Sequence, residues 1–264
     1  MALWHVTEQA RAYFVTKYNM LHFSGNHKEE NHMANMKKYS DMRDIGHLCA
    51  HYARSVAPGH YGNADIDQER LSEDRVNLAP AREGGQTAYI KRQIAEVMDG
   101  RTLRKDAVRM CCWVVDAPQN LPKEKEPEFF QAAYEFMLDR YGCKSGLGED
   151  CVVSAYIHRS ESTPHLHFAF IPVLEQDGQR RMCAKEVVNR ADLSTFHDDL
   201  AAYMEERGIC SKRDILNGKT QRDSSGRALS VKELKRSRQR ERERDKNRDR
   251  WTAENERNIE RGRW

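Results

Sequence analysis

The chain has 264 residues, 39% of them hydrophobic, which is enough for one sizeable packed domain with an extension. No apolar run approaches the roughly 18 residues that cross a bilayer, and the N-terminal segment lacks the basic start and apolar centre of a signal peptide, so we expect a soluble, cytoplasmic protein. The seven cysteines are odd in number and scattered, which favours reduced thiols over a disulfide framework.

The positive charge is concentrated in the C-terminal tail. The formal net charge is +3, yet residues 231–264 hold 13 Lys and Arg against 8 Asp and Glu, so the rest of the chain is slightly acidic. Because acidic and basic residues are interleaved in this tail, we expect a solvated helix or a disordered segment there. A nearly neutral body argues against broad, nonspecific binding of nucleic acid and for a local basic groove.

Three regions are expected along the chain. For residues 1–32 we expect a leader or flexible N-terminal extension, because a helix-compatible segment is followed there by the polar run SGNHKEENH. Residues 33–229 carry the periodic segments and predict the main domain. Residues 230–264 predict a charged helical extension.

The order of the predicted elements indicates the fold class. In chain order we expect a strand at 33–39, a helix at 41–56, a polar, loop-like stretch at 60–85, a helix at 85–100, a strand at 106–117, a helix at 126–142, two strands at 150–158 and 164–174, and a helical segment at 184–208. Ser40 or Asp41 caps the first helix, and Gly142 ends the third. This order is not the strict alternation of a doubly wound parallel sheet. We therefore expect an α/β (α+β) fold, with an antiparallel or mixed sheet covered by helices on one side.

The segment YIHRSESTPHLHFAF, residues 156–170, concentrates three histidines and one glutamate on a predicted hairpin. Since residues i and i+2 of a strand point to the same face, His165 and His167 project together. His158 ends the preceding strand, and antiparallel pairing brings it beside them at a cross-strand Cβ distance of about 5 Å. Three imidazoles can then reach one metal ion.

Three protein ligands with the other positions open describe a catalytic metal site better than a closed structural one. Glu161, in the turn, is either a fourth ligand or a partner that orients a ligand. Two alternatives stay open: a polar strand with surface histidines, and a closed structural zinc site, although no cysteine stands at ligand spacing here.

The stretch HRSESTPHLH resembles the third motif of the plasmid mobilisation relaxases of the MobV type, also known as Mob/Pre plasmid recombination proteins, in which a histidine is followed by acidic residues and PHxH. GHLCAHYAR resembles the first motif of that family, and RKDAV resembles another of its signatures. NGKTQRDSSGRALSVKELKR resembles the segment that closes the relaxase domain. The resemblance covers roughly residues 33–236.

This resemblance implies an HUH-like fold and a DNA relaxase, which makes a site- and strand-specific nick at a plasmid or mobile-element transfer origin through a covalent protein–DNA intermediate and so initiates conjugative mobilisation. The implied cofactor is Mn²⁺ or Mg²⁺, with zinc as an alternative, held by His158, His165 and His167 with Glu161. The implied partners are single-stranded and supercoiled DNA at the origin and the conjugative coupling machinery, with the chain acting as a monomer or dimer in the bacterial cytoplasm.

The resemblance also implies the nucleophile, His51, whose attack on phosphorus yields a phosphoramidate. Tyr52 is the competing nucleophile, because most other relaxases use tyrosine, and neighbours on a helix point about 100° apart, so only one of the pair should face the metal. A histidine at a helix C-terminus is also favoured by the macrodipole alone. Arg54, one turn after His51, either contacts phosphate or is a solvated surface charge.

Arg104 and Lys105, in RKDAV, are expected to contact DNA, with solvated charges as the alternative. One position departs from the family pattern, because members often carry an aspartate two residues after the first histidine of the third motif, where this chain has Ser160. Glu161 is therefore the only acid expected from this motif.

Two other functions compete with a relaxase. An HUH replication initiator would carry its catalytic tyrosine on a helix after the hairpin, where Tyr203 is the only tyrosine and has no lysine near it. A non-catalytic DNA-binding regulator with a structural zinc would need metal to fold but would not cleave DNA.

Overall fold

The computed structural model describes residues 33–55 and 66–216, together with residues 240, 244 and 248. All of them belong to the unit Asn31–Trp264. The expected leader, residues 1–32, and all but three residues of the expected charged extension lie outside the described residues, although those three have helical backbone. Within the described part of the chain, every helix is too short or too polar to span a membrane.

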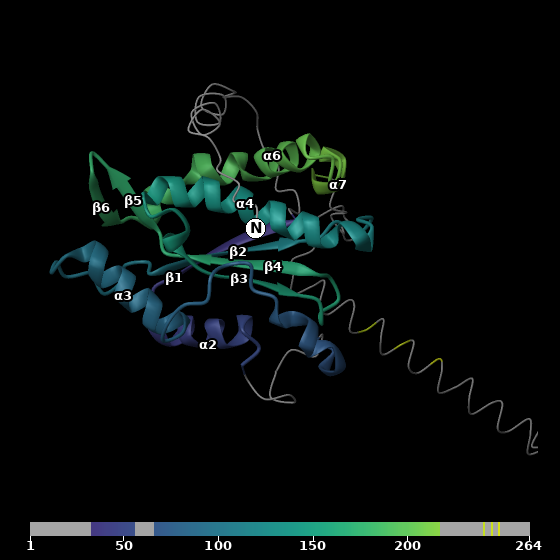
Figure 1. Cartoon of the computed structure of the whole chain (residues 1–264), viewed down its shortest axis with the longest axis horizontal. Coiled ribbons are helices and arrows are strands. Elements are labelled where there is room, and N and C mark those ends of the chain that lie inside the picture. The colour runs from purple at the N-terminus through teal and green to yellow at the C-terminus, as the bar shows by residue number, and fades with distance from the viewer. Residues whose placement is uncertain (1–32, 56–65, 217–239, 241–243, 245–247, 249–264) are drawn as a thin grey trace, which may run out of the picture. The chain divides into compact units, whose positions relative to one another are not determined.

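A four-stranded antiparallel sheet lies at the centre of the described residues (Figure 1). The order across the sheet is β1 (Ala34–Tyr39), β2 (Met110–Asp116), β4 (His165–Phe170) and β3 (Val152–His158). All three neighbouring pairs are antiparallel. The four predicted strands and the antiparallel sheet are therefore confirmed.

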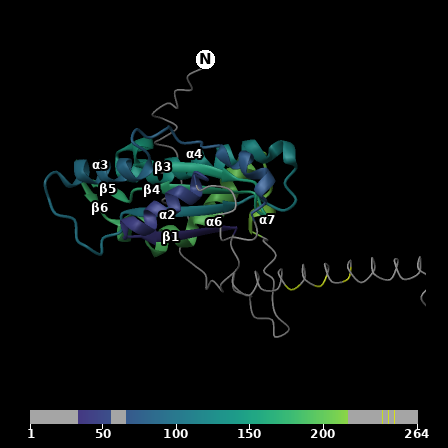
Figure 2. The same cartoon turned by 90° about the horizontal axis from the view of Figure 1, so that it is seen from below.

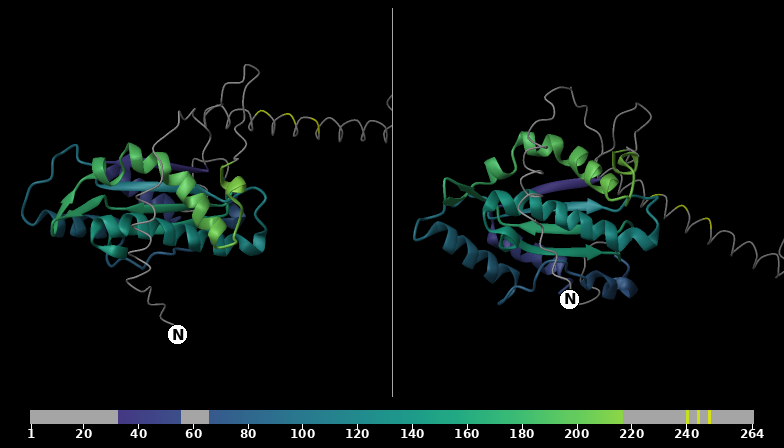
Figure 3. Two further views of the ribbon diagram at one scale, coloured as in Figure 1. Left: turned by 90° about the horizontal axis from the view of Figure 1, so that it is seen from above. Right: turned by 45° about the horizontal axis from the view of Figure 1, so that its top comes forward.

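Helices cover both faces of this sheet (Figures 1 and 2). One face packs against α4 (Glu126–Ser145) and α6 (Arg190–Glu206), and the other against α2 (Met42–Tyr52) and α3 (Gln86–Met98). Figure 3 shows the same three layers from two further directions. The expectation of helices on one side only was wrong. All six residues of β4 are buried, and their side chains alternate between the two faces of the sheet, so both faces must pack against helices.

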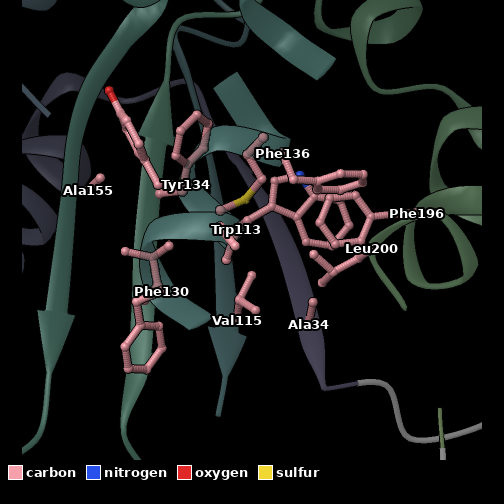
Figure 4. Packing of buried hydrophobic residues seen from close by; sticks show 14 of the residues in the cluster. Ala34, Trp113, Val115, Phe130, Tyr134, Phe136, Ala155, Phe196 and Leu200 are labelled. Carbon is pink, nitrogen blue, oxygen red and sulfur yellow. The ribbon is translucent and has the colours of Figure 1, made fainter. Parts of the chain in front are cut away.

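Aromatic side chains fill the space between the sheet and α4 and α6 (Figure 4). Trp113 of β2 stacks on Phe196 of α6 with ring centroids 3.6 Å apart, and Phe136 of α4 meets the same Phe196 ring edge to face. The indole N–H of Trp113 donates to the Tyr141 hydroxyl at 2.8 Å. Large aromatic side chains bury much apolar area, so this layer anchors the central strand β2.

The helix α4 does not end at Gly142 as expected. It runs on to Ser145, and Gly146 takes the left-handed conformation after it, with φ 61°. Gly142 serves another purpose, because a Cβ atom at this position would lie 2.9 Å from the carbonyl oxygen of Gly148. The glycine permits a close approach of two backbone segments rather than a helix stop.

A small second sheet, β5 (Val173–Gln176) paired with β6 (Gln179–Met182), was not predicted. The expected strand 164–174 is in fact divided between β4 and β5. The turn of the new hairpin is Asp177-Gly178, and both residues have positive φ, 53° and 72°, as a two-residue type I′ turn requires. Beyond it, the expected helical segment consists of α5 (Ala184–Val187) and α6, with α7 (Lys212–Leu216) following.

Candidate active site

The three histidines of the hairpin lie together on the face of the sheet that α2 covers. His158 and His165 are direct cross-strand partners, and the ring centroid of His167 lies 4.5 Å from that of His158 and 4.7 Å from that of His165. The last turn of α2 adds His51, with its ring centroid 5.2 Å from that of His158. Four imidazoles from three elements thus converge.

Backbone carbonyls fix the tautomers of two of these rings. His158 Nε2 lies 2.9 Å from the carbonyl oxygen of Tyr52, and His165 Nδ1 lies 2.8 Å from that of Thr163. Because a carbonyl only accepts, these two nitrogens carry the protons, and His158 Nδ1 and His165 Nε2 keep their lone pairs. His165 Nε2 lies 3.0 Å from His167 Nε2, about the separation of two nitrogens bound at right angles to one ion at about 2.1 Å.

The donor atoms of the site fit a divalent ion. Within the described residues, His158 Nδ1 and His167 Nδ1 are buried without a hydrogen-bond partner, an uncommon situation for polar atoms. Ligand atoms of His51, His158 and His167 lie within 4.8 Å of one another, as do those of His158, Glu161 and His165. Each set could hold a metal, and a site of imidazoles with a carboxylate suits a transition ion. Neither set contains all three hairpin histidines.

Arg54 is a buried cation at the edge of this cluster. It follows the end of α2 with a left-handed φ of 47°, which is unusual for a residue with a side chain. Its side chain is 2% exposed and donates to Asp74 Oδ2 at 2.7 Å and to Glu161 Oε1 at 2.8 Å. Its Nη1 lies 3.3 Å from His51 Nδ1. The alternative of a solvated surface charge is therefore wrong.

Asp74 is a site residue that the sequence did not reveal. It lies in the short 3₁₀ helix η1 (Gln68–Arg75), inside the stretch expected as a polar loop, and it is fully buried. Besides the bond from Arg54, its carboxylate accepts the backbone N–H groups of Arg159 at 2.6 Å and Ser160 at 2.8 Å, and the Ser160 hydroxyl. The site therefore holds a second carboxylate beside Glu161, supplied by a segment outside the motif.

Burial and neighbouring charges set the protonation states. Burial lowers the pKa of His51 to about 4, helped by His158 and Arg54, and burial together with the neighbouring histidines lowers the pKa of His167 well below its usual range. Burial alone would raise the pKa of Glu161, but the charged Arg54 guanidinium, which donates to Glu161 Oε1 at 2.8 Å, outweighs burial and lowers that pKa. At neutral pH His51 and His167 are therefore uncharged, and they lie beside the charged carboxylate of Glu161.

Tyr52 occupies a different environment from its neighbour His51. It is 2% exposed and stacks on His167 with ring centroids 4.5 Å apart, whereas His51 is only partly buried. Burial, and then the neighbouring Cys112, raise the pKa of the Tyr52 phenol well above its usual range. A buried phenol that holds its proton is a poor nucleophile.

Arg104 and Lys105 do not join the cluster. They precede β2 at its Met110 end, whereas Asp116 at the other end of this strand is the cross-strand partner of His165. Six residue steps of a strand span about 20 Å. Arg104 is exposed there and pairs with Asp106 at 2.7 Å.

Tyr203 lies on the wrong side of the sheet to act with the histidines. It belongs to α6, is 1% exposed and packs against Phe136 with ring centroids 5.3 Å apart, in the core between the sheet and α4. The replication-initiator alternative therefore loses its candidate tyrosine.

The family model Mob_Pre, described as plasmid recombination enzyme, matches residues 28–227. The chain belongs to this family. Among curated family members, it is 27% identical to a plasmid recombination enzyme of Lactiplantibacillus plantarum over 68% of this chain and 46% of the relative. A plasmid recombination enzyme of Streptococcus agalactiae is 25% identical over 78% of this chain and 44% of the relative. The chain thus spans a little under half the length of these Mob_Pre relatives.

A solved structure of the same family shares the fold. The MobM relaxase domain (MOBV; Mob_Pre), in a Mn-bound crystal structure with plasmid pMV158 oriT DNA, is 26% identical, with a TM-score of 0.61 over 77% of this chain and 97% of that one. The resemblance seen in the motifs and the relaxase-like fold are therefore confirmed.

Proposed function

We propose that this chain is the nicking domain of a plasmid relaxase, which cuts one strand at the transfer origin of a plasmid or other mobile element and so starts conjugative mobilisation. The observation that carries this proposal is the place of His51, a partly buried imidazole with a pKa of about 4 whose ring lies 5.2 Å from that of His158. Membership of the Mob_Pre family and the oriT DNA in the related MobM structure support it.

His158, His165 and His167 would hold a divalent ion, with Glu161 as a further ligand. We choose Mn²⁺ first, because the related MobM structure is Mn-bound, with Mg²⁺ and zinc as alternatives. When bound, such an ion polarises a phosphoryl oxygen and neutralises charge that develops on it. The lone pairs on His158 Nδ1 and His165 Nε2 support this ligand set.

His51 is the proposed nucleophile. A neutral ring nitrogen attacks the scissile phosphorus, so a P–N bond forms and the bond from phosphorus to the 3′ oxygen breaks. The departing oxygen takes up a proton and becomes a 3′ hydroxyl, and the ring gives up its N–H proton. The strand stays attached through its 5′ phosphate as a phosphoramidate, which retains the energy needed for rejoining. Arg54, next to His51, supplies positive charge near the phosphate.

The DNA contacts extend beyond the nick. Arg104 and Lys105 remain proposed DNA contacts, but they precede the end of β2 that lies away from His165, so they would hold flanking DNA rather than the scissile phosphate. We place the reaction in the bacterial cytoplasm, on supercoiled DNA whose nicked strand is passed to the conjugative coupling machinery, with the chain acting as a monomer or a dimer.

The test is adduct formation with Mn²⁺ and a labelled supercoiled plasmid that carries the element's own origin. We expect a covalent protein–DNA adduct that persists in Tyr52→Phe and disappears in His51→Ala. If the adduct disappears in Tyr52→Phe and persists in His51→Ala, the nucleophile is Tyr52. No adduct and no nick with the unmutated chain would refute the relaxase and favour the DNA-binding regulator.

A further inference from the structure

Tyr52 is the last residue of the face that α2 buries against the sheet. Ile45, Cys49 and Tyr52 are three or four positions apart, and they are the buried residues of this helix. The ring of Tyr52 stacks on that of His167 in β4, with ring centroids 4.5 Å apart and ring planes 28° apart. The hydroxyl end of the ring lies near the thiol of Cys112 in β2, which after burial is the largest influence on the pKa of the phenol. The tyrosine beside the proposed nucleophile is thus packed against a proposed metal ligand.

The three histidines of the hairpin differ in what orients their rings. His158 and His165 each donate a ring proton to a backbone carbonyl. Among the described residues, His167 Nδ1 is buried without a hydrogen-bond partner, and His167 Nε2 faces His165 Nε2 at 3.0 Å. Metal-binding histidines are usually oriented by a hydrogen bond from the nitrogen that does not bind the ion. For His167 the contact that takes the place of this bond is the stack on Tyr52, since the neighbouring histidines meet its ring edge to face.

The stack also favours the metal-bound form of His167. A metal ion withdraws electron density from the imidazole that binds it, so the bound ring becomes partly positive. The face of a phenol ring carries the negative charge of its π electrons and attracts a positive ring more strongly than a neutral one. The carbonyl of Tyr52 meanwhile accepts the proton of His158 Nε2 at 2.9 Å, so one residue contacts two of the three hairpin histidines.

We propose that Tyr52 is a positioning residue for the metal site, whose ring holds His167 in the orientation that binds the ion and whose carbonyl holds His158. In this role Tyr52 takes no part in the attack on phosphorus. The inference deepens the proposed function and rests on its metal site. A buried aromatic residue can also be purely structural, so the two roles must be separated by measurement.

A matched control exists on the opposite face of the same strand. Tyr141 of α4 is 1% exposed and stacks on Phe170 of β4 with ring centroids 4.4 Å apart. Tyr141→Leu therefore removes a buried tyrosine ring from β4, as Tyr52→Leu does. It should lower the melting temperature at least as much, because the Tyr141 hydroxyl also takes part in two buried hydrogen bonds. The ring that covers His167 stays in place in this variant.

Metal affinity is the first readout, and it needs no DNA. In calorimetric titration of the metal-free chain, well below the melting temperature of each variant, Tyr52→Leu should weaken Mn²⁺ binding by roughly tenfold or more. Tyr52→Phe keeps the ring and should stay within about threefold of the unmutated chain, and Tyr141→Leu within about twofold. An unchanged affinity in Tyr52→Leu, or an equal loss in either of the other two variants, would overturn the proposal. If the unmutated chain binds no Mn²⁺, the proposed metal site itself is refuted.

A second readout covers the case in which Tyr52→Leu does not fold, because it uses the unmutated chain and Tyr52→Phe. Protons over the face of an aromatic ring resonate upfield of their ordinary positions. In the metal-free chain, the imidazole C–H signals of His167, assigned as those lost in His167→Gln, should be displaced upfield in the unmutated chain and in Tyr52→Phe. Signals at their ordinary positions in the unmutated chain would mean that no ring covers His167 and would overturn the proposal.

The third readout separates metal binding from chemistry. The Mn²⁺ concentration that gives half the maximal rate of adduct formation should rise roughly tenfold in Tyr52→Leu, whereas the rate at saturating Mn²⁺ should stay within about threefold of the unmutated chain. A large fall in the saturated rate at an unchanged half-saturating concentration would give Tyr52 a role in the chemistry and overturn the proposal. Failure of the unmutated chain to form an adduct would instead refute the relaxase, while the two readouts without DNA still decide the role of Tyr52 at the metal site.

Discussion

His158 and His165 are direct partners across β3 and β4, and each has one ring nitrogen bonded to a backbone carbonyl. The backbone thus selects the nitrogen that each ring can offer to a metal. Their ligand atoms, together with that of Glu161, lie within 4.8 Å of one another. Preorganised donors lose little freedom on binding, so the hairpin itself should supply most of the metal affinity.

The first prediction concerns metal affinity. His158→Ala or His165→Ala should weaken Mn²⁺ binding by about a hundredfold or more, since each removes one preorganised donor. Calorimetric titration of the metal-free chain measures this change. The control is His197→Ala, whose ring Nε2 bonds the carbonyl of Ala34 and is outside the cluster, and it should leave the affinity unchanged. Equal losses in all three variants would contradict the assignment.

The second prediction concerns pH and stability. The pKa of His51 falls from its ordinary value near 6.5 to about 4 in the folded chain, so between these values the unfolded state binds more protons. Stability of the metal-free chain should therefore be fully present above pH 6.5 and fall as the pH drops towards 4. Urea unfolding at pH 7, 6 and 5 measures how steeply the free energy of unfolding changes with pH, and His51→Asn should make this dependence shallower. A slope that is identical in the variant would exclude His51 as a contributor.

The third prediction compares two helical glycines. Gly142→Ala should destabilise the chain by about 1–3 kcal/mol, because the new Cβ would meet the Gly148 carbonyl oxygen at 2.9 Å. Gly46→Ala in α2 has nothing closer than 4.0 Å and should stabilise by up to about 1 kcal/mol through helix propensity. Chemical unfolding of both variants measures the change in the free energy of unfolding that each substitution causes. Changes of the same sign in the two variants would show that the close approach at Gly142 is unimportant.

The fourth prediction separates DNA holding from chemistry. Arg104→Ala should weaken binding of origin DNA and reduce the salt dependence of its affinity by about one phosphate contact. The rate of adduct formation at saturating DNA should not change, because Arg104 is exposed at the sheet end opposite the histidines. Fluorescence anisotropy at several salt concentrations tests the first part. A slower saturated rate would place Arg104 nearer the chemistry than the fold allows.

The histidine cluster could be predicted because its geometry is local in sequence. His158, His165 and His167 lie on one hairpin, and strand periodicity alone puts them on one face. Asp74 could not be predicted, since its contacts with Ser160 bridge 86 positions and QERLSEDR contains other acids that look the same. Its burial is a property of the folded chain, because η1 must first pack against the hairpin turn.

Other departures have equally physical causes. Gly142 looked like a helix stop, yet glycine also serves where two backbones approach closely, and the sequence does not distinguish these uses. The hairpin of β5 and β6 did carry a signal, because the Asp177-Gly178 pair, typical of a two-residue turn, stands just after the expected strand 164–174. Arg104 and Lys105 were assigned from a motif, and a motif does not reveal which end of a strand its residues reach.

The last turn of α2 provides both the His51 side chain and, through the carbonyl of Tyr52, the hydrogen bond that orients His158. Fraying of this one turn would therefore misalign the attacking ring and release a metal-binding ring in a single event. The domain should therefore exchange between a metal-bound state in which His51 is aligned for attack and a metal-free state in which His51 is misaligned. Few molecules should carry the ion while His51 is misaligned. Protection of the α2 amides from hydrogen exchange should rise together with metal occupancy.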